Sequence, residues 1–137
     1  MENSRDPRGL SNRQKQGKTR IESEETILLD TQEWFIVIPH THRSAIYWSQ
    51  NAAWDTSVKN NDRCFNAYNN KGNLYIIRNK YSTKAYQLHI ESKAFYDDQN
   101  VRIDPLRFFT EYKPTFNAIF IHLESFDRQK EFMDSLV

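Results

Sequence analysis

Two runs of β-forming residues decide the fold of this 137-residue chain: Leu74-Tyr75-Ile76-Ile77 and Tyr86-Gln87-Leu88-His89-Ile90-Glu91. The segment 79–83 between them suits a hairpin loop. Successive side chains of a strand point to opposite faces, so alternate residues of the second run share a face. One face carries Tyr86, Leu88 and Ile90, and the other carries Gln87, His89 and Glu91. We therefore expect one face toward the core and the other toward water or a polar site.

A second hairpin is predicted upstream of these runs. The short apolar run 26–29 is followed by a turn at 30–32 and by a run of aromatic and β-branched residues at 34–38. Pro39 should end the second strand, because it has no N–H to donate to a neighbouring strand.

Helix signals flank the central runs. Thr41 suits the N-cap of a helix over about 42–50. A second helix fits 62–69, where Phe65 and Tyr68 are three residues apart and share a face. The sequence Asn69-Asn70-Lys71-Gly72 should end that helix, since these residue types tolerate positive φ.

The C-terminal third also reads as helical. Asp104 followed by Pro105 is a typical helix start, and that helix should run to Tyr112. From Pro114 onward, apolar residues recur at helical spacing. They are Phe116, Ile119, Phe120, Leu123 and Phe126, with Phe132, Met133 and Leu136 continuing the stripe. The middle of this segment, residues 118–121, would also suit a strand, so that alternative stays open.

Together these elements predict a single α+β domain over residues 24–137. We expect an antiparallel sheet built from two hairpins and packed on one face by the helices. Before it, residues 1–23 should form a flexible basic arm, because they offer almost nothing to bury against the entropy of ordering. Residues 1–20 carry a net charge of +4, and since the whole chain carries +1, the remainder carries −3. The arm's cations are Arg5, Arg8, Arg13, Lys15, Lys18 and Arg20.

Composition narrows the function classes. Aromatic residues make up 14% of a chain that is only 38% hydrophobic, so the core should be aromatic. The near-zero net charge argues against a globally basic nucleic-acid binder. A single cysteine, Cys64, excludes an intrachain disulfide and a thiolate metal cluster, and we expect no metal and no cofactor. No apolar run approaches the roughly 20 residues that span a bilayer, so we expect a soluble, cytoplasmic protein without membrane contact.

The polar strand face holds the candidate catalytic residues. His89 lies between Gln87 and Glu91, and a histidine flanked by an amide and a carboxylate can act as acid, base or recognition group. In this hypothesis Trp54, Thr56 and Tyr68 line the cleft. The alternative interpretation is an ordinary solvated sheet face, with a buried Trp54 and a capping Thr56.

A nucleic-acid hypothesis uses other residues. The six cations of the arm could neutralise phosphates without folding, and exposed tyrosines on the central hairpin could stack on bases. These tyrosines are Tyr75, Tyr81 and Tyr86. The alternative for the arm is a solubilising tail.

Several short patterns resemble those of small uncharacterised proteins of tailed bacteriophages and mobile elements. The resemblance covers roughly residues 30–105. It rests on the runs 33–39 and 44–45, Trp54-x-Thr56, Phe65-x-x-Tyr68, Gly72-x-Leu74-Tyr75-Ile76-Ile77, Tyr86-Gln87-Leu88-His89 and the acidic 95–98. This chain has Asp55 where that pattern usually has Cys, so no thiol chemistry is implied. The resemblance implies a phage or mobile-element origin, and hence a bacterial host cytoplasm, without catalytic roles.

The leading functional hypothesis is a small non-enzymatic accessory protein that binds a macromolecular partner, either protein or nucleic acid. It rests on the missing catalytic motif, the aromatic-rich domain and the basic arm. The alternative is a small enzyme with its site on the Gln87, His89 and Glu91 face. The sequence predicts no oligomeric state.

Overall fold

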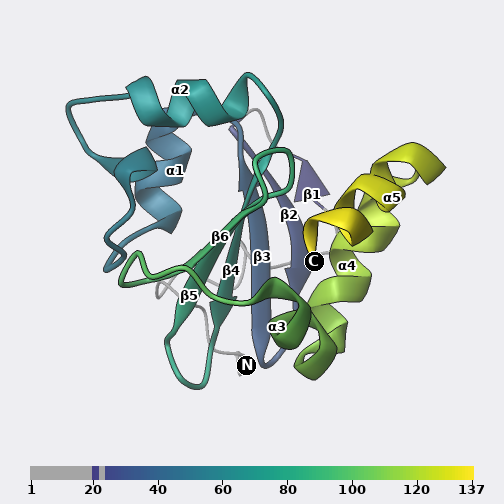
Figure 1. Cartoon of the computed structure of the whole chain (residues 1–137). Coiled ribbons are helices and arrows are strands. Elements are labelled where there is room, and N and C mark those ends of the chain that lie inside the picture. The colour runs from purple at the N-terminus through teal and green to yellow at the C-terminus, as the bar shows by residue number, and fades with distance from the viewer. Residues whose placement is uncertain (1–19, 22–23) are drawn as a thin grey trace.

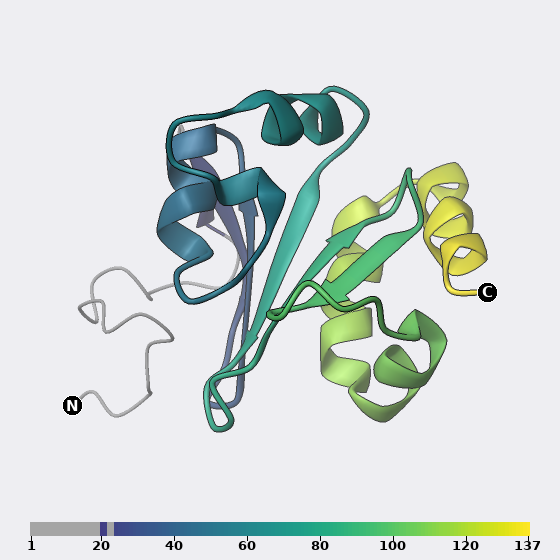
Figure 2. The same ribbon diagram turned by 60° about the vertical axis from the view of Figure 1, so that its left-hand side comes forward.

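In the computed structural model, which describes residues 20–21 and 24–137, one antiparallel sheet lies between two layers of helices (Figures 1 and 2). The strands are hydrogen-bonded side by side in chain order. They are β1 Arg20–Ile21, β2 Glu25–Asp30, β3 Trp34–Pro39, β4 Leu74–Asn79, β5 Ala85–His89 and β6 Ala94–Asp97. Every neighbouring pair is antiparallel, and β1, with only two residues, forms the edge beside β2. The predicted α+β class and the antiparallel sheet are confirmed.

The helices fall into two groups according to their place in the chain. The first group connects β3 to β4 and comprises α1 His42–Trp48, the 3-10 turn η2 Asp55–Ser57 and α2 Arg63–Asn69. The second group follows β6 and comprises α3 Pro105–Glu111, α4 Lys113–Leu123 and α5 Phe126–Ser135. Figure 2 shows the two groups on opposite sides of the sheet. The expectation that helices cover only one face is therefore wrong.

The pattern of burial in β3 explains this arrangement. Every residue of β3 is buried. Phe35 and Val37 belong to the apolar cluster beneath α1, whereas Trp34, Ile36 and Ile38 belong to the cluster beneath α3–α5. A strand that is apolar on both faces needs cover on both faces, as in sheets with helices on each side.

Local signals place most element ends as predicted. The Thr41 hydroxyl accepts a hydrogen bond from the Ser44 N–H at the start of α1. Asp104 accepts from the N–H groups of Leu106 and Arg107 at the start of α3. The segment 118–121 is helical and not a strand, because it lies within α4. The strand β6 was not predicted, and the sheet begins at Arg20, inside the predicted arm.

The predicted C-terminal stripe is broken between α4 and α5. Glu124 adopts φ 64°, and the Ser125 hydroxyl caps α5 by accepting from the Arg128 N–H. The break turns α5, so Phe132 is buried whereas Phe126 is 77% exposed and Met133 is 49% exposed. The predicted apolar stripe therefore does not stay on one buried face, since Phe126 and Met133 are exposed.

Candidate functional site

The predicted polar face of β5 lies in the interior. Gln87 and His89 point to the side of the sheet that α1, η2 and α2 cover, and both are buried. The Thr56 hydroxyl donates a hydrogen bond of 2.6 Å to Oε1 of Gln87. Because Thr56 is itself buried in η2, this pair joins the helical layer to the sheet. Of the two expected surroundings, water and a polar site, the burial of Gln87 and His89 excludes water.

His89 is tied to the end of α2. Its Nε2 lies 2.9 Å from the carbonyl oxygen of Tyr68, and since a carbonyl only accepts, Nε2 carries the proton. Its Nδ1 lies 2.7 Å from the Ser92 hydroxyl. The His89 and Tyr68 rings meet edge to face at 4.8 Å, and burial raises the pKa of the Tyr68 phenol. With 1% exposure and both ring nitrogens hydrogen-bonded, His89 is placed as an anchor for α2.

Glu91 follows β5 and lies between His89 of that strand and Arg128 of α5. Its Oε2 accepts from Nη2 of Arg128 in α5 at 3.1 Å. Its Oε1 lies 3.7 Å from Nε2 of His89 and is buried without a hydrogen-bond partner among the described residues. A Cβ atom at Gly72 would lie 2.1 Å from the Glu91 carboxyl carbon, so the glycine leaves room for this carboxylate.

The role of Gly72 corrects the prediction for the end of α2. No residue of the segment 69–72 adopts positive φ. The helix ends with the Gly72 N–H donating to the Tyr68 carbonyl at 3.1 Å. The glycine is therefore required for the close approach of Glu91, and not for a left-handed backbone.

Trp54 completes this set without opening a cleft. Its Nε1 donates to the carbonyl oxygen of Asp97 at 2.7 Å, and its side chain is buried. The structure thus brings together the residues named for the predicted cleft, pairing Thr56 with Gln87 and Tyr68 with His89. They meet as closed hydrogen-bonded contacts in the interior.

Two further polar residues hold the same layer in place. Buried Arg78, on β4, donates to the carbonyl oxygen of Trp48 at 2.8 Å and to that of Gln50 at 3.2 Å, beyond the end of α1. Glu25, on β2, accepts from the Trp48 indole N–H at 2.6 Å and from the Ser44 hydroxyl at 3.0 Å. We call the side under α1, η2 and α2 the polar-tied face; its sheet residues are Glu25, Arg78, Gln87 and His89.

The tyrosines proposed to stack on bases are differently placed. Tyr75 is 1% exposed, and burial raises its pKa to about 12, against the opposing influence of the Arg128 guanidinium. Tyr86 is half-buried, with ring centroids 4.6 Å from Phe108. Of the three, Tyr81 is exposed, in the β4–β5 loop. The expectation of three exposed stacking rings is therefore wrong.

Tyr86 does border a hollow of about 400 Å³ beside α3. Phe108 and Tyr112 supply further aromatic wall, and both acidic and basic side chains stand around it. The acidic ones include Asp104, whose carboxylate already caps α3, and Asp97, whose Oδ1 accepts from the Gln99 and Val101 N–H groups.

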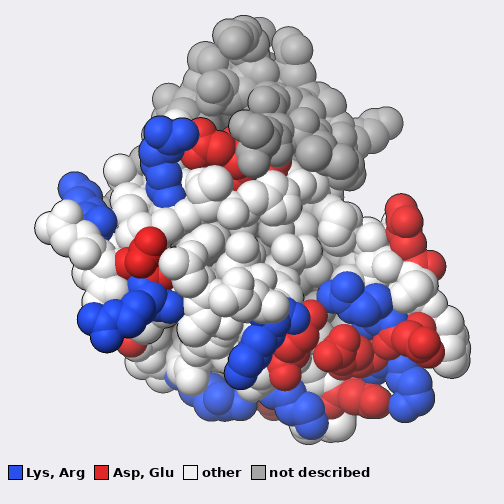
Figure 3. Space-filling view, turned by 90° about the horizontal axis from the view of Figure 1, so that it is seen from above, with Lys and Arg blue, Asp and Glu red and all other residues white. Residues whose placement is uncertain are grey.

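The predicted arm falls almost wholly outside the described residues. Of its cations, only Arg20 is described, and its backbone pairs with Ile27 in the β1–β2 ladder. Arg5, Arg8, Arg13, Lys15 and Lys18 lie outside the described residues. In the view of Figure 3, the basic and acidic side chains of the described residues are interspersed. That face therefore offers mixed charge and not a single-signed surface.

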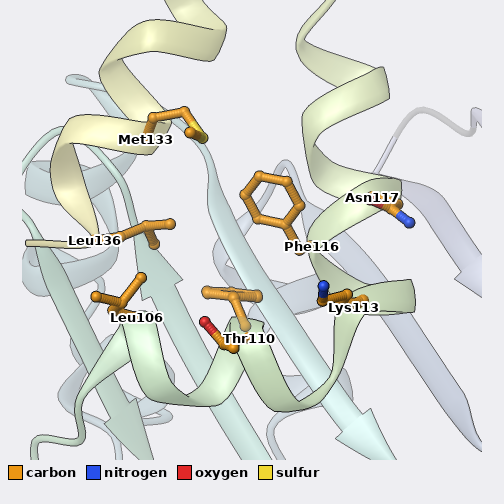
Figure 4. A pocket seen from close by; sticks show the side chains of 8 residues that line it. Leu106, Thr110, Lys113, Phe116, Asn117, Met133 and Leu136 are labelled. Atoms are coloured by element: carbon orange, nitrogen blue, oxygen red, sulfur yellow. The ribbon is translucent and has the colours of Figure 1, made fainter.

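An open apolar surface lies on the helices after β6. One hollow of about 320 Å³ lies between α3, α4 and α5 (Figure 4), and a neighbouring one of about 470 Å³ lies between α4 and α5. Phe116 and Met133 line both hollows, so the two form one groove, here called the α3–α5 groove. Its other lining residues are Leu106, Phe109, Thr110, Lys113, Asn117 and Leu136 in the first hollow, and Phe120, Phe126, Gln129, Lys130 and Asp134 in the second.

The sequence pattern grouped Phe116, Phe120, Phe126 and Met133 in one apolar stripe at helical spacing, without separating its buried members from its exposed ones. One signal could have distinguished the buried apolar residues of α5 from the exposed ones. Phe132 and Met133 are adjacent, and neighbouring residues on a helix point about 100° apart. Both can face a core only if the buried arc is wide. Charged residues at 127, 128, 130 and 131 show that the arc of α5 is narrow, so one of the two had to face outward.

Comparisons with protein-family models, with curated proteins and with solved structures found no match to this chain. Among the residues that the structure describes, no helix is long and apolar enough to cross a membrane. Within the same part of the chain, no three His, Cys, Asp or Glu side chains lie close enough together to hold a metal ion.

Proposed function

We propose that this protein is a small non-enzymatic accessory protein that binds another protein through the α3–α5 groove. The observation that carries the proposal is the grouping of exposed Leu106, Phe126 and Met133 around two contiguous hollows. Contiguous exposed apolar surface rimmed by polar residues is typical of interaction sites. The resemblance to phage and mobile-element proteins supports an accessory role in a bacterial host.

The chemistry of the groove favours a protein segment over a nucleic acid. Its walls are aromatic and aliphatic. A protein surface that binds nucleic acid instead carries basic residues, which contact the phosphate backbone. In the second hollow, Lys130 is paired with Asp134 at 3.2 Å, which lowers its value as a phosphate ligand. A groove between helices is suited to an amphipathic helix that inserts apolar side chains at helical spacing.

The alternative of an enzyme on the β5 face has less support. Catalysis would require Gln87, His89 and Glu91 to meet a substrate, but Gln87 and His89 are buried beneath η2 and α2. His89 has both ring nitrogens in hydrogen bonds, one of them to a backbone carbonyl. These contacts favour a structural role for the cluster.

The proposal is tested by pairing two exposed substitutions on the full chain. Met133→Glu places a charge in both hollows, whereas Ile121→Glu changes a side chain that is 70% exposed on α4 and lines neither hollow. We expect the same bacterial protein to be recovered by affinity capture with the wild type and Ile121→Glu, and lost with Met133→Glu. Equal thermal melts would show that all three chains are folded. Recovery by Met133→Glu at the wild-type level would refute the proposal.

A further inference from the structure

The first hollow of the α3–α5 groove has an unbalanced charge. Lys113, the first residue of α4, is exposed and lines the hollow, and it forms no ion pair with another described residue. Figure 4 shows its amine directed toward the space beside the Phe116 ring. Lys130, the other cation that lines the groove, pairs with Asp134, and Arg128 of α5 pairs with Glu91 and Glu131.

The two sides of this hollow differ in chemistry. Met133 and Leu136 of α5 supply an apolar wall. The opposite side, formed by α3 and α4, is mixed: it supplies apolar Leu106, Phe109 and Phe116 together with the Lys113 amine and the Thr110 hydroxyl. The amide of Asn117 is directed toward the outer rim (Figure 4).

An occupant of the hollow would remove water from the Lys113 amine. Leaving an ammonium group desolvated without an acceptor is costly, so a purely apolar occupant would bind against that penalty. A carboxylate in the occupant would instead form a charge-assisted hydrogen bond with the amine. We infer that the groove binds an acidic amphipathic segment of a partner protein, with apolar side chains against α5 and a carboxylate on Lys113. This inference rests on the proposed function and names its partner chemistry.

The test uses a library of random peptides displayed against the immobilised full-length protein. Peptides retained by the wild type and released by Met133→Glu bind the groove. Among these we expect Asp or Glu to accompany Leu, Phe or Trp, and the enrichment of acidic residues to disappear when the same library is applied to Lys113→Met.

The best peptide, labelled with a fluorophore, then gives affinities by anisotropy at several salt concentrations. We expect Lys113→Met to weaken binding roughly three- to tenfold and to flatten the salt dependence. Replacing the peptide's acidic residue by its amide should have the same effect, and combining both changes should add nothing further. Lys59→Met, at an exposed lysine in the segment between η2 and α2, is the matched control and should bind like the wild type.

Two outcomes overturn different claims. If the groove peptides lack acidic residues and bind Lys113→Met more tightly than the wild type, the inference about Lys113 fails and the proposed function stands. If no retained peptide is released by Met133→Glu, the proposed function itself fails.

Discussion

Both faces of the sheet pack apolar side chains against their helices, as the stacked rings of Phe35 and Trp48 at 4.8 Å do beneath α1, but they differ in the contacts added to that packing. On the polar-tied face, individual hydrogen bonds join single side chains of the sheet to helix ends, as Arg78 does at the end of α1 and His89 does at the end of α2. On the opposite face, aromatic rings pack against one another over α3, α4 and α5. Phe109, for example, has ring centroids 5.1 Å from Phe108 and 5.6 Å from Phe132.

This difference indicates which substitutions should destabilise each layer. A hydrogen bond depends on one partner and on geometry, so it can be lost or restored by pairs of substitutions. Ring packing is distributed over many contacts and depends on volume, so it cannot be repaired at one site. The packing of this layer is incomplete at its outer edge, where Phe116 and Met133 line the open groove.

The largest effect is expected from Phe132→Ala, which removes the fully buried ring of α5 from between Phe109 and Phe116. We expect a loss of about 3–5 kcal/mol in the free energy of unfolding, because the cavity cannot close fully. Urea titration measures it. The exposed Phe126→Ala is the control and should leave the midpoint nearly unchanged. A loss below about 1 kcal/mol would show that the aromatic layer is loosely packed.

His89→Ala tests the polar-tied face at the most buried of its four polar sheet residues. We expect a loss of about 2–3 kcal/mol in the free energy of unfolding, since the ring and its hydrogen bonds to the Tyr68 carbonyl and to Ser92 all disappear. Thermal and urea unfolding of the variant provide the measurement. Normal melting combined with a lost activity would favour the enzyme alternative over the anchoring role.

A smaller effect is expected at the Thr56–Gln87 pair, where one change can be reversed by another. Thr56→Val leaves Oε1 of Gln87 buried without the Thr56 donor and should cost about 1–2 kcal/mol in the free energy of unfolding. Adding Gln87→Leu removes the orphaned oxygen and should recover most of that loss. A double variant no more stable than Thr56→Val would contradict the pairwise character assigned to this face.

The smallest effect at neutral pH is expected from Tyr75→Phe, on the face of the sheet that packs against α3, α4 and α5. The hydroxyl is buried without a hydrogen-bond partner among the described residues, so its removal should change the free energy of unfolding by less than about 0.5 kcal/mol. At alkaline pH the two chains should diverge. The pKa of Tyr75 rises from 10 to about 12 on folding, so the unfolded chain loses its proton first. The wild type should therefore lose stability relative to Tyr75→Phe as pH rises from about 10 to about 12. Parallel pH profiles would refute this.

Much of the fold could be predicted because its signals are local. The caps at Thr41 and Asp104 each act within three residues of the helix they start. The hairpins follow from alternation and from short loops. Strand β6 was missed because it is only four residues long and ends in an aspartate. The cover on both faces was missed although β3 carries a continuous apolar run, the pattern of a strand buried on each side.

The candidate site was less predictable. Gln87 and His89 share one face of the sheet, as side-chain alternation predicts, but alternation left open whether that face meets water or a polar site. The hydrogen-bond partner of Gln87, Thr56, is 31 residues away in the sequence, and that of His89, Tyr68, is 21 residues away. No local sequence pattern predicts such pairs. Likewise the groove depends on the turn at Glu124, which rotates α5 so that Met133 faces outward.

By itself the sequence determined the α+β class, the two hairpins and most helix ends, because hydrogen-bond caps, turns and side-chain alternation act over a few residues. Only the tertiary structure decided which side of the sheet would be polar-tied and that Met133 would line a groove. It also decided that both ring nitrogens of His89 would be hydrogen-bonded, so that this residue anchors α2. Burial and hydrogen-bond partnership depend on segments that are distant in sequence and meet only when the chain has folded, so no short window of residues contains them.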